Sequence, residues 1–272
     1  MLRPLAVVTI LLACLVAPAW SQSPSTASPP STPAAKKPAP KAKAAAKPAA
    51  ATADSGPCRY GVIIAVGDVF SVQKIGLTVF GNEYTEVPVF WGLEDLIFAR
   101  TRAAAGGIPM RRISFVKGAF DSYYHPKPSL FRNPNQELAE LVRQVAGNAG
   151  CERYYVFTRL RGQVQGTNQF AEGIGVLNRG VGLLNSTSLF ANLSLKVFDG
   201  QNFELRRAPV DLDAIMKRMV ASLAGDPSLH KIDDSAFPTS PEDAAKSAIL
   251  QESTRNLLTE RLDKFLPAYF KE

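Results

Sequence analysis

The sequence predicts an α/β or α+β fold in which a mixed β-sheet is covered by amphipathic helices. Two apolar, β-branched runs, Cys58–Val66 and Cys151–Leu160, have the composition of buried strands. Strand-like and amphipathic helical segments alternate between and around these two runs, which is typical of a sheet packed against helices. A hairpin signal near residues 188–207 and a helical C-terminus then complete the pattern.

The N-terminus has the composition of a secretory signal peptide. The apolar run Leu5–Val16 is too short to span a bilayer, and small residues allow cleavage after Ser21. We therefore expect residues 1–21 to be removed on export to the periplasm or the exterior, with no transmembrane segment left behind. The alternative is lipidation of Cys14, because Leu11–Cys14 loosely resembles the lipobox of bacterial lipoproteins.

Residues 22–57 are an Ala/Pro/Lys-rich linker that we expect to be disordered, because it has almost no side chains to bury. The excess positive charge of the chain is concentrated here, and the sequence from Ser55 onward is nearly neutral. Nucleic acid is therefore not expected as a partner, since phosphate binding needs a dense basic face on a folded surface. The lysines fit a weak tether to an anionic envelope polymer, and a plain soluble spacer is the alternative.

Residues 58–272 are expected to form a single globular domain with C-terminal helices. Tyr60–Val66 is a continuous apolar run, and a second β-rich run follows the break at Gly67-Asp68. Gly81-Asn82 supplies a turn that leads back into a short strand. A β-hairpin is therefore predicted near residues 60–90.

Two helices are predicted in the first half of this domain. The first begins at Leu93 and stops before Gly106-Gly107. The second begins at Asn133-Pro134, because an Asn side chain caps a helix and Pro fits its first turn. Between them we expect a strand at Met110–Val116 and a long loop at Lys117–Arg132.

The second half opens with a glycine-rich segment, Gly162–Asn185, that we interpret as a flexible excursion. Regular structure resumes with a strand at Leu189–Phe198, and Asp199-Gly200 is a strong hairpin signal. A helix is expected after Asp211, and a last long helix begins at Ser240-Pro241.

In outline this succession resembles small periplasmic α/β domains of the TolB amino-terminal or CsgG type. The local point of similarity is the hairpin turn Phe198-Asp199-Gly200, which places an Asp at the turn. The resemblance implies a fold of strands and helices ending in a hairpin, and it implies no activity.

Two cysteines, Cys58 and Cys151, remain once the signal is removed, and each stands at the head of a predicted strand. If the strands are parallel neighbours, their starts share one edge of the sheet and the thiols reach bonding distance. We predict a Cys58–Cys151 disulfide in an oxidising compartment, with two buried free thiols as the alternative.

Few residues support a specific chemistry. With only His125 and His230 available, no metal site is expected, and no glycine pattern indicates a phosphate-binding cofactor. Asp68, which follows a strand, and Glu94, at a helix start, are weak acid–base candidates. The alternative is that Asp68 is an ordinary turn residue and that Glu94 interacts with the helix dipole.

Two segments are candidates for a partner or ligand surface. Tyr123-Tyr124-His125 lies in the long loop and suits contact with a partner or a sugar-like ligand, unless the loop is packed by its own aromatics. The glycine-rich segment has more apolar residues than a solvated loop needs, so it either meets a partner or covers the core. Its candidate surface residues are Phe170, Ile174, Leu177 and Arg179.

These observations favour an exported bacterial cell-envelope protein that acts as a non-catalytic binding or assembly module on a basic tether. The expected partner is an envelope protein or an anionic envelope polymer. A periplasmic hydrolase or transferase that uses carboxylate residues is the alternative, and a subunit of an oligomer is a third hypothesis.

Overall fold

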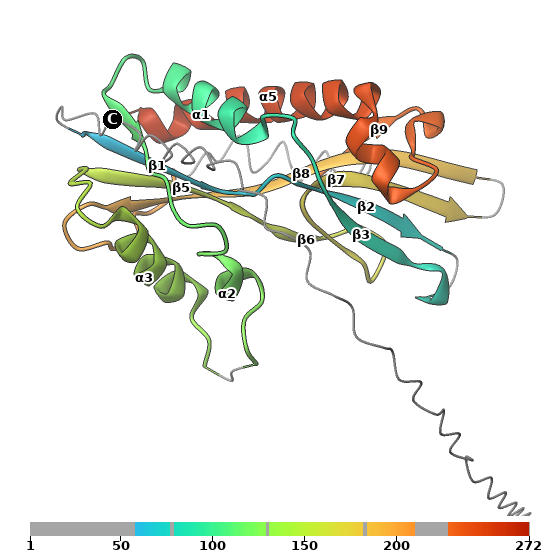
Figure 1. Cartoon of the computed structure of the whole chain (residues 1–272), viewed down its shortest axis with the longest axis horizontal. Coiled ribbons are helices and arrows are strands. Elements are labelled where there is room, and N and C mark those ends of the chain that lie inside the picture. The colour runs from blue at the N-terminus through green and yellow to red at the C-terminus, as the bar shows by residue number, and fades with distance from the viewer. Residues whose placement is uncertain (1–57, 77–78, 129–130, 182–183, 210–227, 272) are drawn as a thin grey trace, which may run out of the picture. The chain divides into compact units, whose positions relative to one another are not determined.

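The structure is a computed structural model of the chain, and it describes residues 58–76, 79–128, 131–181, 184–209 and 228–271. The expected signal peptide, the linker and the helix expected after Asp211 lie outside the described residues. The described part is a mixed β-sheet with helices on both faces, so the fold class expected from the sequence is confirmed (Figure 1).

The sheet has nine strands in the described part of the chain, in the order β3-β2-β7-β8-β5-β1-β4, with β6 beside β7 and β9 beside β8. The strands are β1 (Tyr60–Ala65), β2 (Val69–Ile75), β3 (Glu83–Pro88), β4 (Met110–Arg112), β5 (Arg153–Arg159), β6 (Arg161–Gln163), β7 (Phe170–Val181), β8 (Leu184–Asp199) and β9 (Leu229–Ile232).

Strand β8 joins two halves of the sheet. Its first part pairs antiparallel with β7 and β9, and its second part pairs antiparallel with β5. One half contains β5, β1 and β4, which run parallel to one another, and the other contains β7, β2 and β3. Consecutive strands β1 and β2 therefore belong to different halves, and the chain crosses between them at Gly67-Asp68.

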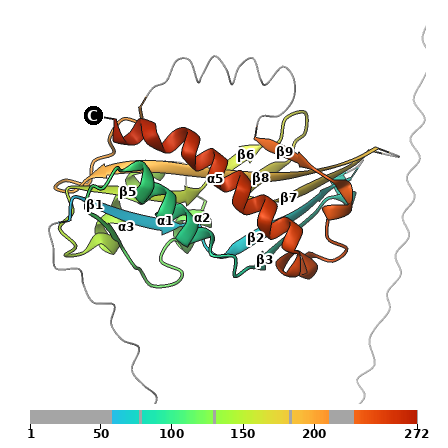
Figure 2. The same ribbon diagram turned by 90° about the horizontal axis from the view of Figure 1, so that it is seen from above.

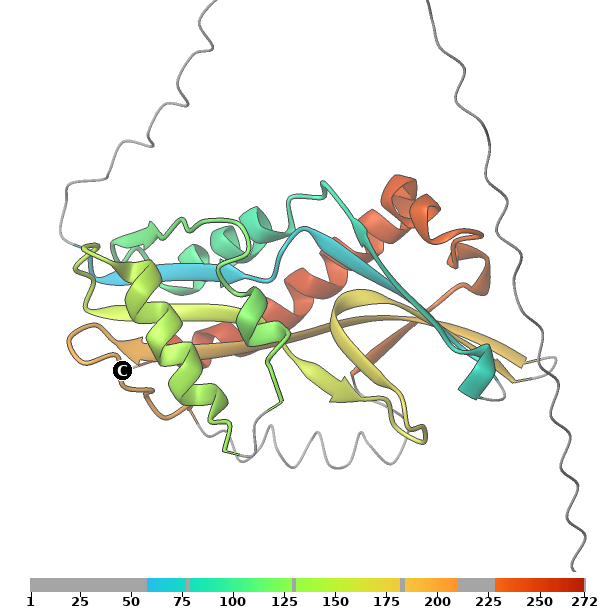
Figure 3. The same ribbon diagram turned by 60° about the horizontal axis from the view of Figure 1, so that its bottom comes forward.

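Helices cover both faces of the sheet. The α-helices are α1 (Leu93–Ala104), α2 (Asp121–Tyr124), α3 (Pro134–Ala146) and α5 (Ala248–Phe270), and short 3-10 helices lie at Val79–Gly81, Asp234–Ala236 and Pro241–Lys246. Helices α1 and α5 lie on one face, and α2 and α3 lie on the other (Figures 1 and 3). Figure 2 shows α5 running obliquely across the sheet, over both halves.

Alternating side chains of the strands build a core on each face, as the period of two in a β-strand requires. In β1, Val62 and Ile64 pack toward α1 and α5, whereas Ile63 and Ala65 pack toward α3. A third, smaller cluster lies under β6 and the start of β7. Its members are Val164, Ala171, Leu177 and Phe190.

Several elements expected from the sequence are confirmed. β2 and β3 form the antiparallel hairpin, and α1 runs from Leu93 to Ala104. Asn133 caps α3, since its side-chain oxygen accepts the backbone N–H groups of Asn135 and Gln136 at 3.2 and 3.3 Å. The cap satisfies donors that have no partner within the helix.

The two cysteine-headed strands are parallel neighbours, as expected, because β1 pairs with β5 with Tyr60 opposite Arg153. Cys58 and Cys151 precede these residues, and the structure joins them in a disulfide with 4.5 Å between their Cα atoms. The expectation that the two thiols lie within bonding distance is thus confirmed.

The interpretation of Gly162–Asn185 as a flexible excursion is wrong. This segment contains β6 and β7 and the first residues of β8, and β7 is central in the sheet. A Cβ atom on Gly175 would lie 2.3 Å from the backbone oxygen of Ser71 and 2.5 Å from the ring of Phe190. The glycine thus permits close packing of strands, which is a use that local sequence does not reveal.

Smaller differences concern the ends of elements. The turn at Asp199-Gly200 is present, but the returning chain pairs with β8 only through a bridge between Phe198 and Leu205. Ser240 begins a 3-10 helix with a capping box to Asp243, and the long helix starts later, at Ala248. The capping signal at Ser240 therefore begins the 3-10 helix Pro241–Lys246, and the prediction that it begins the long helix is wrong.

Candidate functional site

A cluster of polar side chains lies where the two halves of the sheet meet, on the face of α2 and α3. Its residues come from β2, β3, α2, β5 and β7, which are far apart in the sequence. We call it the junction cluster, and its members are Ser71, Gln73, Tyr84, Glu86, Tyr124, Arg159 and Glu172.

Arg159, the last residue of β5, is the centre of the junction cluster, and its side chain is only 10% exposed. Its Nη1 donates to Glu86 Oε1 at 2.9 Å, and its Nε lies 4.0 Å from Glu172 Oε1. Its guanidinium lies 4.1 Å from the ring centroid of Tyr124. A nearly buried cation needs such partners, because desolvation of an unpaired charge costs several kcal/mol.

Tyr124 connects α2 to the carboxyl ends of β1 and β5 by hydrogen bonds. Its hydroxyl accepts the backbone N–H of Arg159 at 3.1 Å and donates to the carbonyl oxygen of Ala65. Burial raises the pKa of Tyr124 to about 12, so this hydroxyl stays protonated and keeps its donor role. The hydroxyl of Tyr124 is therefore engaged within the protein.

The rest of the loop around Tyr124 is packed by its own side chains. The Tyr123 ring meets the Tyr124 ring edge-on at 5.5 Å, and Arg132 donates to the Tyr123 carbonyl at 2.8 Å. Burial also raises the pKa of Tyr123. Of the three loop residues proposed as a contact surface, only His125 is exposed, so the packing alternative describes both tyrosines.

Tyr84 is the most exposed aromatic residue of the junction cluster, at 51% exposure. Its hydroxyl donates to Glu86 Oε1 at 2.6 Å and lies 3.4 Å from Ser71 Oγ. Partial burial and the neighbouring Glu86 raise the pKa of Tyr84 to about 12. Among the described residues the Tyr84 ring pairs with no other aromatic ring, and its exposed part can meet a ligand.

Two buried polar atoms of the junction cluster have no hydrogen-bond partner in the part of the chain that the structure describes. They are Arg159 Nε, a donor, and Gln73 Oε1, an acceptor. Gln73 Nε2 donates to the backbone carbonyl of Phe170 at 2.7 Å, and Phe170 is 42% exposed. Tyr84 lies opposite Gln73 in the β2–β3 pair, so Gln73 lies between two half-exposed aromatic residues, Tyr84 on β3 and the backbone of Phe170 on β7.

The other residues proposed as a surface on the glycine-rich segment lie elsewhere. Ile174 and Leu177 are 2% and 1% exposed, because they pack into the cores on opposite faces of the sheet. Arg179 is half-buried and donates to the carbonyl of Gln165 at 2.7 Å. The structure thus corrects the surface assignment of Ile174 and Leu177 and leaves Phe170 accessible.

The two acid–base candidates come together at the chain crossing after β1. Burial and then the charge of Asp68 raise the pKa of Glu94, whereas Arg112 opposes the shift. Arg112 Nη2 donates to Glu94 Oε2 at 2.7 Å, and its Nη1 binds Asp95. A carboxyl group with a raised pKa is suited to general acid catalysis. The hydrogen bond from Arg112, however, favours the charged form of Glu94.

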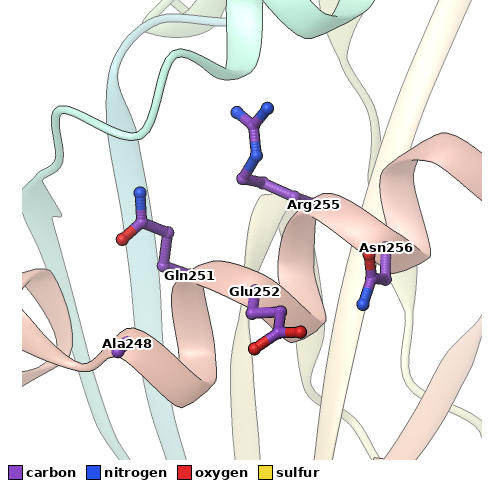
Figure 4. Close-up of a pocket in the computed structure, with 5 residues that line it drawn as sticks. All are labelled: Ala248, Gln251, Glu252, Arg255 and Asn256. Carbon is purple, nitrogen blue, oxygen red and sulfur yellow. The ribbon is translucent and has the colours of Figure 1, made fainter.

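Two shallow hollows lie apart from both groups of residues. Figure 4 shows the first, on the early turns of α5, where Gln251 and Arg255 project from the helix in the same direction. It has a volume of about 230 Å³, and Arg255 Nη1 donates to the carbonyl of Trp91 at 2.6 Å. The second, of about 280 Å³, lies beside Phe131 at the start of α3.

Within the described ranges, no three His, Cys, Asp or Glu side chains are grouped so that they would hold a metal ion. None of the helices described by the structure combines the length and the apolar character needed to cross a bilayer.

The sequence pointed to Asp68, Glu94 and the tyrosine loop but missed Arg159. A cation at the carboxyl end of a buried strand is one available signal, because sites in α/β folds gather at the carboxyl ends of strands. Its partners Glu86 and Glu172 carry no comparable signal, since their approach to Arg159 depends on how β3 and β7 pair.

Comparison with known proteins gives one distant similarity. No family model and no curated protein matches the sequence. Among solved structures, the chain is similar to the hypothetical protein CT253 from Chlamydia trachomatis, with 9% identity and a TM-score of 0.25 over 78% of this chain and 99% of that one. A similarity at this level carries no argument about function.

Proposed function

We propose that the protein is an exported envelope protein that binds a neutral, hydroxylated ligand, such as a glycan strand, at the junction cluster. The observation that carries the proposal is a pair of buried atoms without hydrogen-bond partners, Arg159 Nε and Gln73 Oε1, in a cluster that includes the half-exposed Tyr84 and adjoins Phe170. A binding site commonly combines apolar or aromatic walls with a few polar groups that await a partner.

The charge of the junction cluster selects the class of ligand. Glu86 and Glu172 supply two carboxylates, and two guanidinium groups balance them, that of Arg159 and that of Arg161, which lies 4.4 Å from the centroid of the Phe170 ring. The tyrosines are neutral at physiological pH. Because no excess positive charge is left, the site has little attraction for a phosphate or carboxylate ligand. Hydroxyl groups fit better, because they donate to one atom and accept from another, as Gln73 Oε1 and Arg159 Nε require.

Export is supported by the signal-like N-terminus and by the cysteine pair. Cys58 and Cys151 lie within disulfide distance, and disulfides persist mainly in oxidising compartments such as the periplasm. The proposed tether role of residues 22–57 rests on their basic composition, because they lie outside the described residues.

Binding is tested by co-sedimentation with isolated cell-wall sacculi and by calorimetry with a chito-oligosaccharide. We expect retention of the unaltered protein, and Tyr84→Ala or Phe170→Ala should weaken binding roughly tenfold or more, as for aromatic residues central to an interface. Phe131→Ala is the matched control, because this aromatic residue is 93% exposed and is not a member of the junction cluster. Equal binding by all four proteins, or none by the unaltered one, contradicts the proposal.

A carboxylate-dependent hydrolase or transferase is a second candidate, favoured by the raised pKa of Glu94 beside Asp68. In that case the protein should turn over a glycan or ester substrate, and Glu94→Gln should abolish turnover without loss of ligand binding. Turnover that survives both Glu94→Gln and Asp68→Asn excludes these residues as the acid and base.

A further inference from the structure

The start of β7 pairs with β6 in a short antiparallel ladder that lies on the side of the sheet where α2 and α3 lie (Figure 1). In its register Arg161 lies opposite Glu172, and Gln163 lies opposite Phe170. Because successive side chains of a strand point to opposite faces, these four side chains share one face of the ladder, and Ala171 points to the other. We call these four residues the ladder face.

The inner side of the ladder holds it on the sheet. Val164 and Ala171 are each 1% exposed, and they pack against Leu177 and Phe190 of the sheet. Three of the four residues of the ladder face are exposed, the exception being Glu172. The inner side chains therefore account for the folding of the ladder, and the ladder face is left to meet solvent or a ligand.

The ladder face is continuous with the junction cluster, because Glu172 belongs to both. Its Oε1 lies 4.0 Å from Arg159 Nε, and its backbone carbonyl accepts the Ser71 hydroxyl at 3.4 Å. Two residues earlier on the same strand, the backbone carbonyl of Phe170 accepts Gln73 Nε2 at 2.7 Å. The two buried atoms without hydrogen-bond partners, on Arg159 and Gln73, thus both lie where the junction cluster meets the ladder.

The ladder face combines an apolar surface with hydrogen-bonding groups. The guanidinium of Arg161 lies 4.4 Å from the centroid of the Phe170 ring, and in the described part of the chain it forms no ion pair. Its N–H groups can therefore donate to a ligand beside the ring. Gln163 Nε2 donates to the carbonyl of Thr167 at 2.9 Å, which leaves Gln163 Oε1 to accept from a ligand.

We propose that the ladder face is a second subsite of the same binding site, so that the protein holds a chain of sugar units across the junction cluster and the ladder. This inference rests on the proposed function and adds to it the form of the ligand. A chain is favoured over a single unit because Gln73 lies between the two half-exposed aromatic residues, Tyr84 on β3 and Phe170 on the ladder. The charges of Arg161 and Glu172 balance, so the ladder face suits the same neutral class of ligand.

The dependence of affinity on ligand length tests the second subsite. Calorimetry on the full exported chain with chito-oligosaccharides from the dimer to the hexamer compares ligands that fill one subsite with ligands that fill both. We expect the affinity to rise roughly tenfold or more over this series and then to level off, because the longer ligands make a second group of contacts. An affinity that is independent of length, from the shortest oligosaccharide that binds, overturns the second subsite and leaves the proposed function standing. No binding at any length contradicts both.

Arg161→Ala tests the residues of the second subsite. It should remove most of the gain in affinity with length, whereas Tyr84→Ala should weaken the binding of short and long oligosaccharides alike. Arg143→Ala is the matched control, because this guanidinium also lies over an aromatic ring, that of Phe203 at 5.4 Å, but belongs to α3 and to neither subsite. Circular dichroism should show that Arg161→Ala is folded, since this side chain is exposed. An unchanged length dependence in Arg161→Ala, or an equal loss in Arg143→Ala, overturns the assignment.

Discussion

Removal of the Cys58–Cys151 disulfide should produce a large loss of stability. The bond joins residues 93 positions apart, and it closes the loop between the heads of the parallel strands β1 and β5. In the chain-entropy model, opening a loop of this length raises the conformational entropy of the unfolded chain. This lowers the free energy of the unfolded state by about 4.7 kcal/mol. This is a large fraction of the stability of a typical domain, which is about 5–15 kcal/mol.

The variant to use is Cys58→Ala combined with Cys151→Ala. Alanine is preferable to serine because Cys151 is only 3% exposed, so a hydroxyl there would be buried among apolar neighbours. For a domain of this size, each kcal/mol lowers the melting temperature by roughly 2–4 °C, so we expect a decrease of about 10–20 °C.

The assay is thermal and guanidinium unfolding followed by circular dichroism, with and without reductant. Reductant should destabilise the unaltered protein by a similar amount, and it should leave the double variant unchanged. A loss below about 1 kcal/mol would refute the entropic reasoning, since it would show that the unfolded chain gains little freedom when the loop opens. Two alkylatable thiols in the exported protein would refute the bond itself.

Three further substitutions test other parts of the structure. Gly175→Ala should cost about 1–3 kcal/mol or more in urea unfolding, because its Cβ would overlap Ser71, whereas the control Gly162→Ala meets only ordinary contacts. Asn133→Ala should cost about 1 kcal/mol, and rescue by Asp would confirm a capping role. Burial raises the pKa of Glu94, so the folded state holds its proton more tightly than the unfolded state. This group therefore lowers stability as pH rises from the ordinary pKa of a glutamate through the raised pKa of the folded state. Glu94→Gln should remove that decrease from the pH profile of the urea midpoint, and parallel profiles for the two proteins would contradict it.

Much of the fold follows from features that are local in the sequence. The cap at Asn133 depends on backbone groups two and three residues away, so its helix is predicted with the correct start. Periodicity identifies α1 and the buried strands β1 and β5 for the same reason. Even the disulfide follows once the strands are parallel neighbours, because each cysteine stands at the head of its strand.

The glycine-rich segment shows where local reasoning fails. A run of glycines with apolar residues is consistent with a flexible loop, and equally with a strand that must approach its neighbours closely. The choice depends on Ser71 and Phe190, which lie against Gly175 only after β2 and β8 have paired with β7. Since the deciding contact is distant in sequence, no window around Gly175 contains it.

By itself, the sequence determined the starts of α1 and α3, the buried strands β1 and β5, the cysteine positions and the signal-like N-terminus, because each depends on residues close together in the chain. Only the tertiary structure decided that Arg159 meets Glu86 and Glu172, and that β3 is left at an edge. The physical reason is that strand order is set by which apolar faces are buried together across the whole domain. The same long-range pairing therefore places both the junction cluster and the edge strand β3.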